Sequence, residues 1–212
     1  MKTDDLIASL VADHPSRTRP VWLWLLAGIC AALPLSGALF MMSLGMRPDI
    51  STAIYNPFFD LKFLVTLALA SSAAALSLHL SRPNASLHGW MWLLALPVGL
   101  LGIGIVADFA VPQRVNWTGR LVGSSSMACM SSIPLFSAPF LIAALLMLRK
   151  GATSHPMLLG AFAGLMSAGL GAAIYAAHCM DDSPLFVATW YTLAAAFVTL
   201  IGAMIGRRIL RF

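Results

Sequence analysis

Long apolar runs separated by short polar stretches make up most of the chain. Six runs are long enough to cross a bilayer as a helix, which takes roughly 20 residues. A β-barrel would instead show segments of about 10 residues with alternating hydrophobicity. The sequence therefore predicts an all-α, polytopic membrane protein with six transmembrane helices. The helices are expected at about residues 21–43, 58–80, 89–110, 127–148, 156–177 and 185–206.

The composition excludes a soluble domain. Of 212 residues, 59% are hydrophobic and only 10% are charged, whereas charged residues make up about a quarter of a typical soluble domain. The net charge of +5 comes from Lys and Arg near the ends of the apolar runs, so it gives no reason to expect nucleic-acid binding. We expect three parts: an amphipathic N-terminal segment (1–20), a six-helix transmembrane domain (21–206) and a basic tail (207–212).

Lys and Arg are distributed unevenly between the two sides that six spans define. Nine fall on one side and four on the other. The richer side is expected to face the cytoplasm, which places both termini there. The nine are Lys2, Arg17, Arg19, Arg82, Arg149, Lys150, Arg207, Arg208 and Arg211, and the four are Arg47, Lys62, Arg114 and Arg120.

The N-terminal segment has the pattern of a short amphipathic helix, in which four apolar residues share one stripe. Helices that bind membrane surfaces usually carry Lys and Arg on their polar face. This segment carries aspartates, which suit a basic protein partner better than anionic lipid. A loose tail or a helix lying on the membrane is the alternative. The residues concerned are Asp4, Asp5, Leu6, Ile7, Leu10 and Val11.

Glycines at a spacing of four residues predict close packing of the last two spans. Gly160 and Gly164 lie in one span, and Gly202 and Gly206 lie in the other. Small residues at this spacing allow helix backbones to approach closely. The span at 156–177 is rich in Gly and Ala throughout, so we expect it at the centre of the bundle.

Two of the three cysteines are expected to lie on the same, outer side of the membrane. Cys129 begins one span and Cys179 follows the next, antiparallel span, so both return to one face. A disulfide requires Cα atoms within about 7 Å, which a tight helical hairpin allows but does not guarantee. The periplasm permits disulfides. The alternative is two unrelated small residues. Cys30 lies within the first span, where an inert packing residue is expected.

The polar neighbours of Cys179 suggest further chemistry. His178 adjoins the thiol, and an imidazole can promote the thiolate, the reactive and metal-binding form. Cys129, His178, Cys179 and Asp181 together offer ligands for a thiophilic metal. No CxxC motif is present, which makes a metal site the weaker hypothesis and a disulfide the stronger one. Asp181 and Asp182 have the simpler alternative of a solvated loop.

Two other classes of function fit less well. A membrane thiol oxidoreductase should have a CxxC motif or a second cysteine pair, and this chain has neither. A small six-span transporter should have charges near the middle of the membrane. Asp60, Lys62 and Asp108 all lie near predicted outer ends, and for Asp60 and Lys62 an equal alternative is that they are snorkelling residues at a loop edge. We therefore do not expect an enzyme.

Four segments resemble the NrsF family. They are the run Cys-Met-Ser-Ser-Ile-Pro-Leu-Phe-Ser that starts at Cys129, the turn at 149–152, the segment 178–191 and the tail 206–212. This family comprises six-span, multi-pass anti-sigma factors of the bacterial inner membrane, which negatively regulate an extracytoplasmic-function sigma factor of the sigma-F type. The resemblance covers the whole chain and is strongest from Cys129 onward.

The resemblance implies a function. A protein of this family sequesters its sigma factor on the cytoplasmic side under non-stress conditions, and the residues matching Cys129 and Cys179 sense oxidants or thiophilic metals. The partners are then a sigma factor and the lipid bilayer, without direct contact to nucleic acid. No resident cofactor is expected, and a thiophilic metal would act only as a transient signal. The residue pattern adds the acidic N-terminal segment, with the turn at 149–155, as the candidate sigma-binding surface.

Overall fold

The computed structural model describes residues 3, 5, 20–110 and 117–211. Within these ranges the regular elements are helices, and no strand occurs among them. The six long helices of the bundle are α2 (Val21–Ser43), α4 (Pro57–Leu80), α5 (Ala95–Phe109), α7 (Ser126–Leu148), α8 (Pro156–Ala176) and α10 (Thr192–Ile209). The short elements are α3 (Ile50–Ala53), the 3-10 helix η1 (Trp90–Leu94), α6 (Trp117–Val122), α9 (Pro184–Phe186) and the π-helix η2 (Val187–Tyr191).

The predicted all-helical architecture is confirmed. In the described part of the chain, six helical segments are long and apolar enough to span a membrane. They are Val21–Ser43, Pro57–Leu80, Trp90–Phe109, Trp117–Leu148, Pro156–Ala176 and Pro184–Ile209. The last segment extends beyond the predicted end at residue 206, so Arg207 and Arg208 belong to the final turn of α10. Cations at a helix C-terminus interact favourably with the helix dipole, which accounts for the longer helix.

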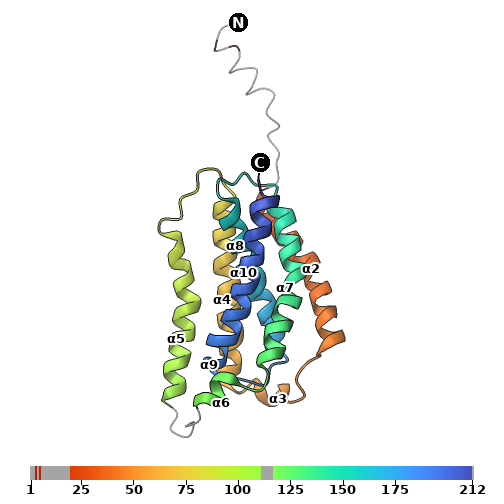
Figure 1. Ribbon diagram of the computed structural model, residues 1–212, viewed down its shortest axis with the longest axis vertical. Helices are drawn as coiled ribbons and strands as arrows, with labels where there is room; N and C mark the ends of the chain where they lie inside the picture. Colours follow the sequence, from red (N-terminus) through yellow and green to blue (C-terminus); the bar gives the residue numbers. More distant parts are fainter. Residues whose placement is uncertain (1–2, 4, 6–19, 111–116, 212) are drawn as a thin grey trace.

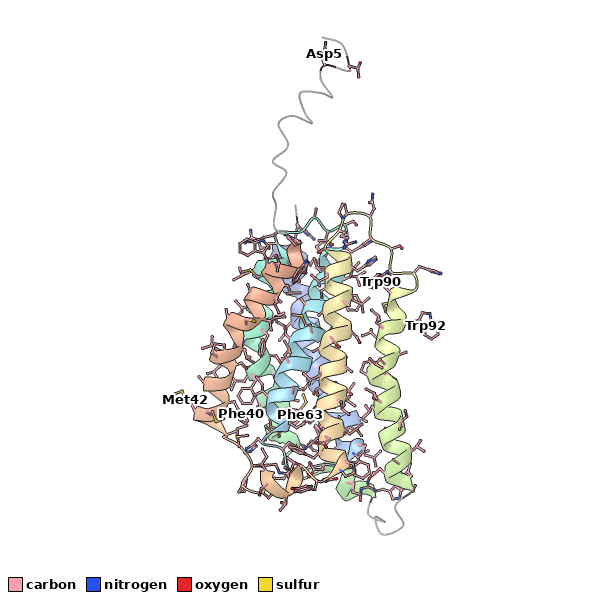
Figure 2. The ribbon with its side chains drawn as sticks, turned by 180° about the vertical axis from the view of Figure 1, so that it is seen from behind. Asp5, Phe40, Met42, Phe63, Trp90 and Trp92 are labelled. Atoms are coloured by element: carbon pink, nitrogen blue, oxygen red, sulfur yellow. The ribbon has the colours of Figure 1, made fainter. Side chains whose placement is uncertain are left out.

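Most of the predicted amphipathic N-terminal segment lies outside the described residues. This holds for Asp4, Leu6, Ile7, Leu10 and Val11. Asp5, labelled in Figure 2, is helical and exposed. The predicted sigma-binding surface at this segment therefore stays a prediction.

Helix α8 forms the centre of the bundle, as its glycine pattern predicts. It is enclosed by α4, α7 and α10 (Figure 1). A Cβ added at Gly160 would collide with the backbone of Gly202 and Gly206 on α10. On its other sides, a Cβ at Gly169 would meet the backbone of α4, and one at Gly171 would meet α7. The missing side chains thus allow three neighbours to pack directly on the α8 backbone.

Helices α2 and α5 lie at the outside of the bundle (Figure 1). Helix α2 packs against α7, and the buried Ser36 hydroxyl donates to the Phe136 carbonyl at 2.7 Å. Helix α5 packs mainly against α4, where Gly104 faces Leu61. In the segment Trp90–Phe109, which comprises η1 and α5, only 11% of the most apolar stretch is buried inside the protein, the lowest share among the six segments. Helix α5 is therefore the most loosely attached of the long helices.

The bundle has two chemically different ends. Helix α2 begins and α10 ends at the same end (Figure 1), which we call the basic end because Arg149, Lys150, Arg207 and Arg208 lie there. Lys150 Nζ lies 3.0 Å from the ring centroid of Trp24 at this end. The opposite end contains the turns between α2 and α4 and between α8 and α9, and we call it the thiol end.

Substitution of Gly202 by Leu is expected to separate α8 from α10. The new side chain would meet the Gly160 carbonyl and the Gly164 backbone, which cannot move without shifting the helix. Overpacking of this kind costs about 1–3 kcal/mol and more where backbone is struck. Thermal unfolding in detergent should show a lower midpoint for Gly202→Leu than for the unaltered protein. Gly99→Leu is the control, because no atom lies within 4 Å of a Cβ at Gly99. Equal midpoints for the two variants would contradict the packing.

Candidate functional site

The thiol end contains a buried cluster around two cysteines. Cys129 lies in the first turn of α7, Cys179 follows the end of α8, and both are 0% exposed. Both are free thiols. We call this group the thiol cluster, and it consists of Phe40, Cys129, Ile133, Phe136, Ala172, Tyr175, Ala176, Cys179, Phe186, Val187, Tyr191 and Ala194.

The structure thus brings together the two cysteines that the sequence pairs, while the third lies elsewhere. Cys30 is an exposed residue of α2 and is not part of the thiol cluster. Figure 2 shows Phe40, a cluster member, and Phe63, which packs against the cluster, at the same end of the bundle. Cys129 and Cys179 thus lie in one buried cluster at the same end of the bundle.

Burial controls the acidity of Cys179. Burial raises the pKa of the Cys179 thiol, and the positive charge of Lys62 only partly opposes this rise. The thiol is therefore mostly protonated at neutral pH, and it reacts slowly until the site opens or a specific oxidant reaches it. The thiol donates to the Asp181 carbonyl at 3.7 Å.

Two buried cations hold the backbone of Cys179. Lys62 Nζ donates to the Cys179 carbonyl at 2.9 Å, and Arg47 Nη1 donates to the same oxygen at 3.2 Å. Both cations also pair with the Asp182 carboxylate, at 2.7 Å for Lys62 and 3.0 Å for Arg47. Lys62 is only 1% exposed and Arg47 only 5%. The interpretation of Lys62 as a snorkelling residue is therefore wrong, because Asp182 and the Cys179 carbonyl give it partners inside the protein. Asp60 is exposed.

The two aspartates after Cys179 are structural, so the alternative of a solvated loop is wrong. Asp181 accepts hydrogen bonds from the backbone N–H groups of Ser124 and Ser125, at 3.1 and 2.9 Å, at the start of α7. Asp182 accepts from Asn56 Nδ2 at 3.2 Å in addition to its ion pairs. The loop 177–183 is thereby attached to α4, to the start of α7 and to the segment after α2.

His178 contributes to the same attachment. Its Nδ1 lies 3.0 Å from the Gly45 carbonyl, which belongs to the segment after α2. The backbone N–H of Arg47 donates to the Ala177 carbonyl at 3.2 Å. His178 therefore anchors the loop.

The four predicted metal ligands do not converge. His178 points to the Gly45 carbonyl and the Asp181 carboxylate points to the start of α7. In the described ranges of the chain, no group of three or more His, Cys, Asp or Glu side chains is placed to hold a metal ion. Cys129 and Cys179 are the soft ligands that share a cluster. The geometry therefore favours chemistry of the two thiols alone.

Asp181→Ala is expected to weaken the start of α7. The substitution leaves the N–H groups of Ser124 and Ser125 without their carboxylate acceptor. Loss of an N-terminal helix cap costs about 0.5–2 kcal/mol. The expected result is a moderately lower thermal midpoint and faster alkylation of Cys129, four residues after Ser125. Asp181→Asn is the matched control because it retains an acceptor oxygen. Equal alkylation rates in Asp181→Ala and the unaltered protein would contradict this role.

Sequence reasoning missed the residues that hold the site together. Arg47, Lys62 and Asp182 form one ion network whose two cations are buried, and Asp108, 1% exposed, pairs with Arg120. One signal was available. Charged residues are rare within membrane-spanning segments and usually pair with one another, so residues of opposite charge on the same side of the membrane are expected to form ion pairs.

Comparison with known proteins gives consistent results along the whole chain. The chain matches the NrsF family, described as "Negative regulator of sigma F", over residues 10–212. It is 34% identical to "Anti-sigma-F factor NrsF" of Caulobacter vibrioides (strain NA1000 / CB15N), with 100% of both chains covered. It is 30% identical to "Probable anti-sigma-F factor NrsF" of Azospira oryzae (strain ATCC BAA-33 / DSM 13638 / PS), again with 100% of both covered. No solved structure matches the chain.

Proposed function

This chain belongs to the NrsF family of negative regulators of sigma F, and we propose that it is a membrane-bound anti-sigma factor with a thiol switch. It holds an extracytoplasmic-function sigma factor at the cytoplasmic face of the bacterial inner membrane. Oxidation of Cys129 and Cys179 releases that sigma factor. The observation that supports this proposal is the burial of both thiols in one cluster at one end of the bundle.

The orientation of the bundle follows from charge. The basic end carries Arg149, Lys150, Arg207 and Arg208, and positive charge favours the cytoplasmic side. Trp90 and Trp92 lie toward this end (Figure 2), where aromatic side chains suit a membrane interface. The thiol end then faces the periplasm, where disulfides persist. The proposed orientation puts both termini in the cytoplasm, and it is supported by the position of the start of α2 and the end of α10 at the basic end.

The switch is a two-electron oxidation. The S–H bonds of Cys129 and Cys179 break, a sulfur–sulfur bond forms, and an oxidant takes up two electrons and two protons. Cys129 belongs to α7, whereas Cys179 belongs to the loop that Lys62 and Arg47 attach to α4 and to the segment after α2. The new bond therefore adds a covalent link between the start of α7 and this loop, which are already in contact through Asp181, and it shifts their packing.

Helices transmit the change to the other end. Helix α7 has 23 residues and α8 has 21, so each carries a displacement over roughly 30–35 Å at 1.5 Å per residue. The turn at 149–155 joins them at the basic end. A change of about 10⁴-fold in affinity for the sigma factor needs about 5.5 kcal/mol. A disulfide commonly contributes about 2–4 kcal/mol, so a partial release of the sigma factor is the expected response. A thiophilic metal that bridges the two thiols would act in the same way.

The sigma factor is proposed to contact the acidic N-terminal segment and the turn at 149–155. Leu6, Ile7, Leu10 and Val11 supply an apolar stripe, and Asp4 and Asp5 supply charge. Beside the turn, His155, Arg207 and Arg211 line a groove of about 250 Å³. This groove offers a positively charged rim at the same face.

Leu10→Asp is expected to weaken sigma-factor binding by about tenfold or more, since it replaces an apolar contact with an unpaired charge that is costly to bury at an interface. The measurement is co-purification of the sigma factor with the tagged protein from detergent extract. Ser9→Asp adds the same charge at the adjacent position outside the apolar stripe, and it should retain binding. Retention of binding by Leu10→Asp would remove this segment from the interface.

The experiment that tests the proposed function is co-purification with and without oxidant. The unaltered protein should retain the sigma factor under reducing conditions and release it after oxidation. A sigma factor that never co-purifies, or one that stays bound after both thiols are oxidised, would contradict the proposal.

A further inference from the structure

Two hollows that share residues open at the basic end of the bundle, where α10 ends beside the start of α8. The larger has a volume of about 520 Å³ and the smaller a volume of about 250 Å³. Arg207 and Arg211 line both hollows, and Arg208 lines the larger one as well. We call the two hollows together the arginine site.

The packing of α8 on α10 fixes the backbone that carries these arginines. Gly206 lies directly against the start of α8, because an added Cβ would come within 2.9 Å of the Pro156 carbonyl oxygen. Leu210 is 0% exposed, and its backbone N–H donates to the Gly206 carbonyl at 2.9 Å. Arg207 and Arg211 come just before and just after this anchored stretch of the chain. The fold therefore holds both at one place.

The charge of the arginine site is not balanced by the protein. Within residues 20–110 and 117–211, six Lys and Arg residues lie at the basic end, whereas all five aspartates lie at the thiol end. The six are Arg82, Arg149, Lys150, Arg207, Arg208 and Arg211, and the five are Asp49, Asp60, Asp108, Asp181 and Asp182.

The three arginines of the site are exposed, and none of them has an ion-pair partner among the described residues. At the thiol end, in contrast, Arg47 pairs with Asp182 and Arg120 pairs with Asp108. Guanidinium groups match phosphate geometry with two parallel hydrogen bonds. The arginine site thus suits a ligand that brings phosphate.

The walls of the arginine site are apolar. Met204 and Ile205 line the larger hollow, and Met157 and Leu158 line the smaller one. Met204 is 61% exposed and Met157 is 53% exposed, and both belong to segments that can span a membrane. Met204 precedes Arg207 by three residues on α10, so it lies deeper along the bundle. Positive charge at the end and apolar surface below it match the headgroup and acyl chains of a phospholipid.

From these features we infer that the arginine site binds an anionic phospholipid. The guanidinium groups of Arg207 and Arg211 donate to phosphate oxygens, and the acyl chains lie along Met204 and Met157. Basic pockets between membrane helices bind lipid headgroups in this way. A lipid with two phosphates, such as cardiolipin, reaches both hollows, whereas phosphatidylglycerol supplies one phosphate. The inference does not depend on the thiol switch, since it requires only that the bundle spans the membrane.

The sigma factor is the competing occupant, because the smaller hollow lies beside the turn at 149–155. The walls of the site favour the lipid. A soluble protein reaches the exposed arginines, but Met204 belongs to the membrane-spanning segment Pro184–Ile209, where an acyl chain can cover it. A phospholipid satisfies the charge and the apolar wall with one molecule.

The test is native mass spectrometry of the full chain in detergent, with cardiolipin, phosphatidylglycerol or phosphatidylcholine added. The unaltered protein should bind cardiolipin most tightly, phosphatidylglycerol less tightly and the zwitterionic phosphatidylcholine most weakly. The double variant Arg207→Gln with Arg211→Gln should lose about tenfold or more of its affinity for cardiolipin, because charge-assisted hydrogen bonds to phosphate are lost.

Arg82→Gln with Arg149→Gln is the matched control. It removes the same charge from the same end, but neither residue lines the arginine site, so its affinity for cardiolipin should stay close to that of the unaltered protein. All four residues are exposed, so the thermal midpoint without lipid should change little in either double variant. Excess inorganic phosphate should not displace cardiolipin, because it has no acyl chain to cover Met204.

Four results would count against the inference. Equal cardiolipin affinity in the Arg207 and Arg211 double variant and the unaltered protein would overturn it. Equal losses in the two double variants would overturn it too, since they would show attraction by the whole end. Displacement of cardiolipin by phosphate would identify a site for the free anion. Loss of sigma-factor co-purification with full lipid binding would assign the arginines to the sigma factor.

Discussion

A Cys179→Ser variant is expected to keep its sigma factor bound under oxidant that releases it from the unaltered protein. The disulfide needs both sulfur atoms, so the whole oxidant-dependent part of release should disappear. The fold should persist, because a serine hydroxyl is small enough for the same buried position and can donate to the Asp181 carbonyl, which now accepts from the thiol at 3.7 Å. The measurement is the activity of a sigma-dependent reporter, together with co-purification, before and after oxidant.

The three cysteines provide an internal control. Cys129→Ser should behave like Cys179→Ser, since the two thiols share the cluster. Cys30→Ser should respond like the unaltered protein, because Cys30 is exposed on α2 and does not belong to the thiol cluster. Release of the sigma factor from Cys129→Ser under oxidant would exclude the disulfide form of the switch.

Lys62→Met is expected to lower the free energy of unfolding by roughly 3–5 kcal/mol, the largest loss among these variants. Removal of one partner of an ion pair leaves the charge of the other partner uncompensated. Lys62 is 1% exposed, and it pairs with Asp182 at 2.7 Å and with the Cys179 carbonyl at 2.9 Å. Methionine preserves the length of the side chain but not its charge. The remaining contact of Asp182 with Arg47 places the expected loss toward the lower part of this range.

The consequence for function should be release without oxidant. Loosening of the loop at Cys179 removes the anchor that holds the reduced arrangement, so reporter activity should rise under non-stress conditions. Unfolding in mixed detergent micelles measures the stability. Asp60→Asn is the matched control, two residues away on the same helix and exposed, and Lys62→Arg should partly restore the unaltered behaviour. A fully stable, fully repressing Lys62→Met would show that the ion network does not hold the site.

The helices were predictable because hydrophobic length determines them. The run at 21–43 corresponds to α2, and α4, α7 and α8 begin and end within one residue of their predicted limits. Helices α5 and α10 begin later than predicted, at residues 95 and 192, because the 3-10 helix η1 precedes α5, and α9 and the π-helix η2 precede α10. The central place of α8 followed from its glycines, which the structure shows packed against the backbones of α4, α7 and α10. Helices α3 and α6 were missed, since elements of four and six residues carry no periodic signal of their own.

The position of Cys129 and Cys179 at one end was also predictable, because two consecutive antiparallel helices of similar length, 23 and 21 residues, cross the bundle in opposite directions. The ion network around them was not. Lys62 and Asp182 are separated by 120 residues in the sequence, and a charge at the edge of an apolar run can point outward to water or inward to a partner. Only the packed structure shows that Arg47, Lys62 and Asp182 point inward. The π-helical turn at Tyr191 was likewise hidden, because hydropathy does not report hydrogen-bond register.

The most direct test of the thiol switch is the covalent state of the cysteines at the moment of release. Cells that express the full chain are treated with graded oxidant, free thiols are trapped with N-ethylmaleimide, and peptides are mapped by mass spectrometry while the co-purified sigma factor is measured in the same samples. The expected result is a Cys129–Cys179 cross-linked peptide that appears at the oxidant dose at which the sigma factor is lost, with Cys30 still alkylated. Release of the sigma factor while Cys129 and Cys179 are both alkylated would contradict the account.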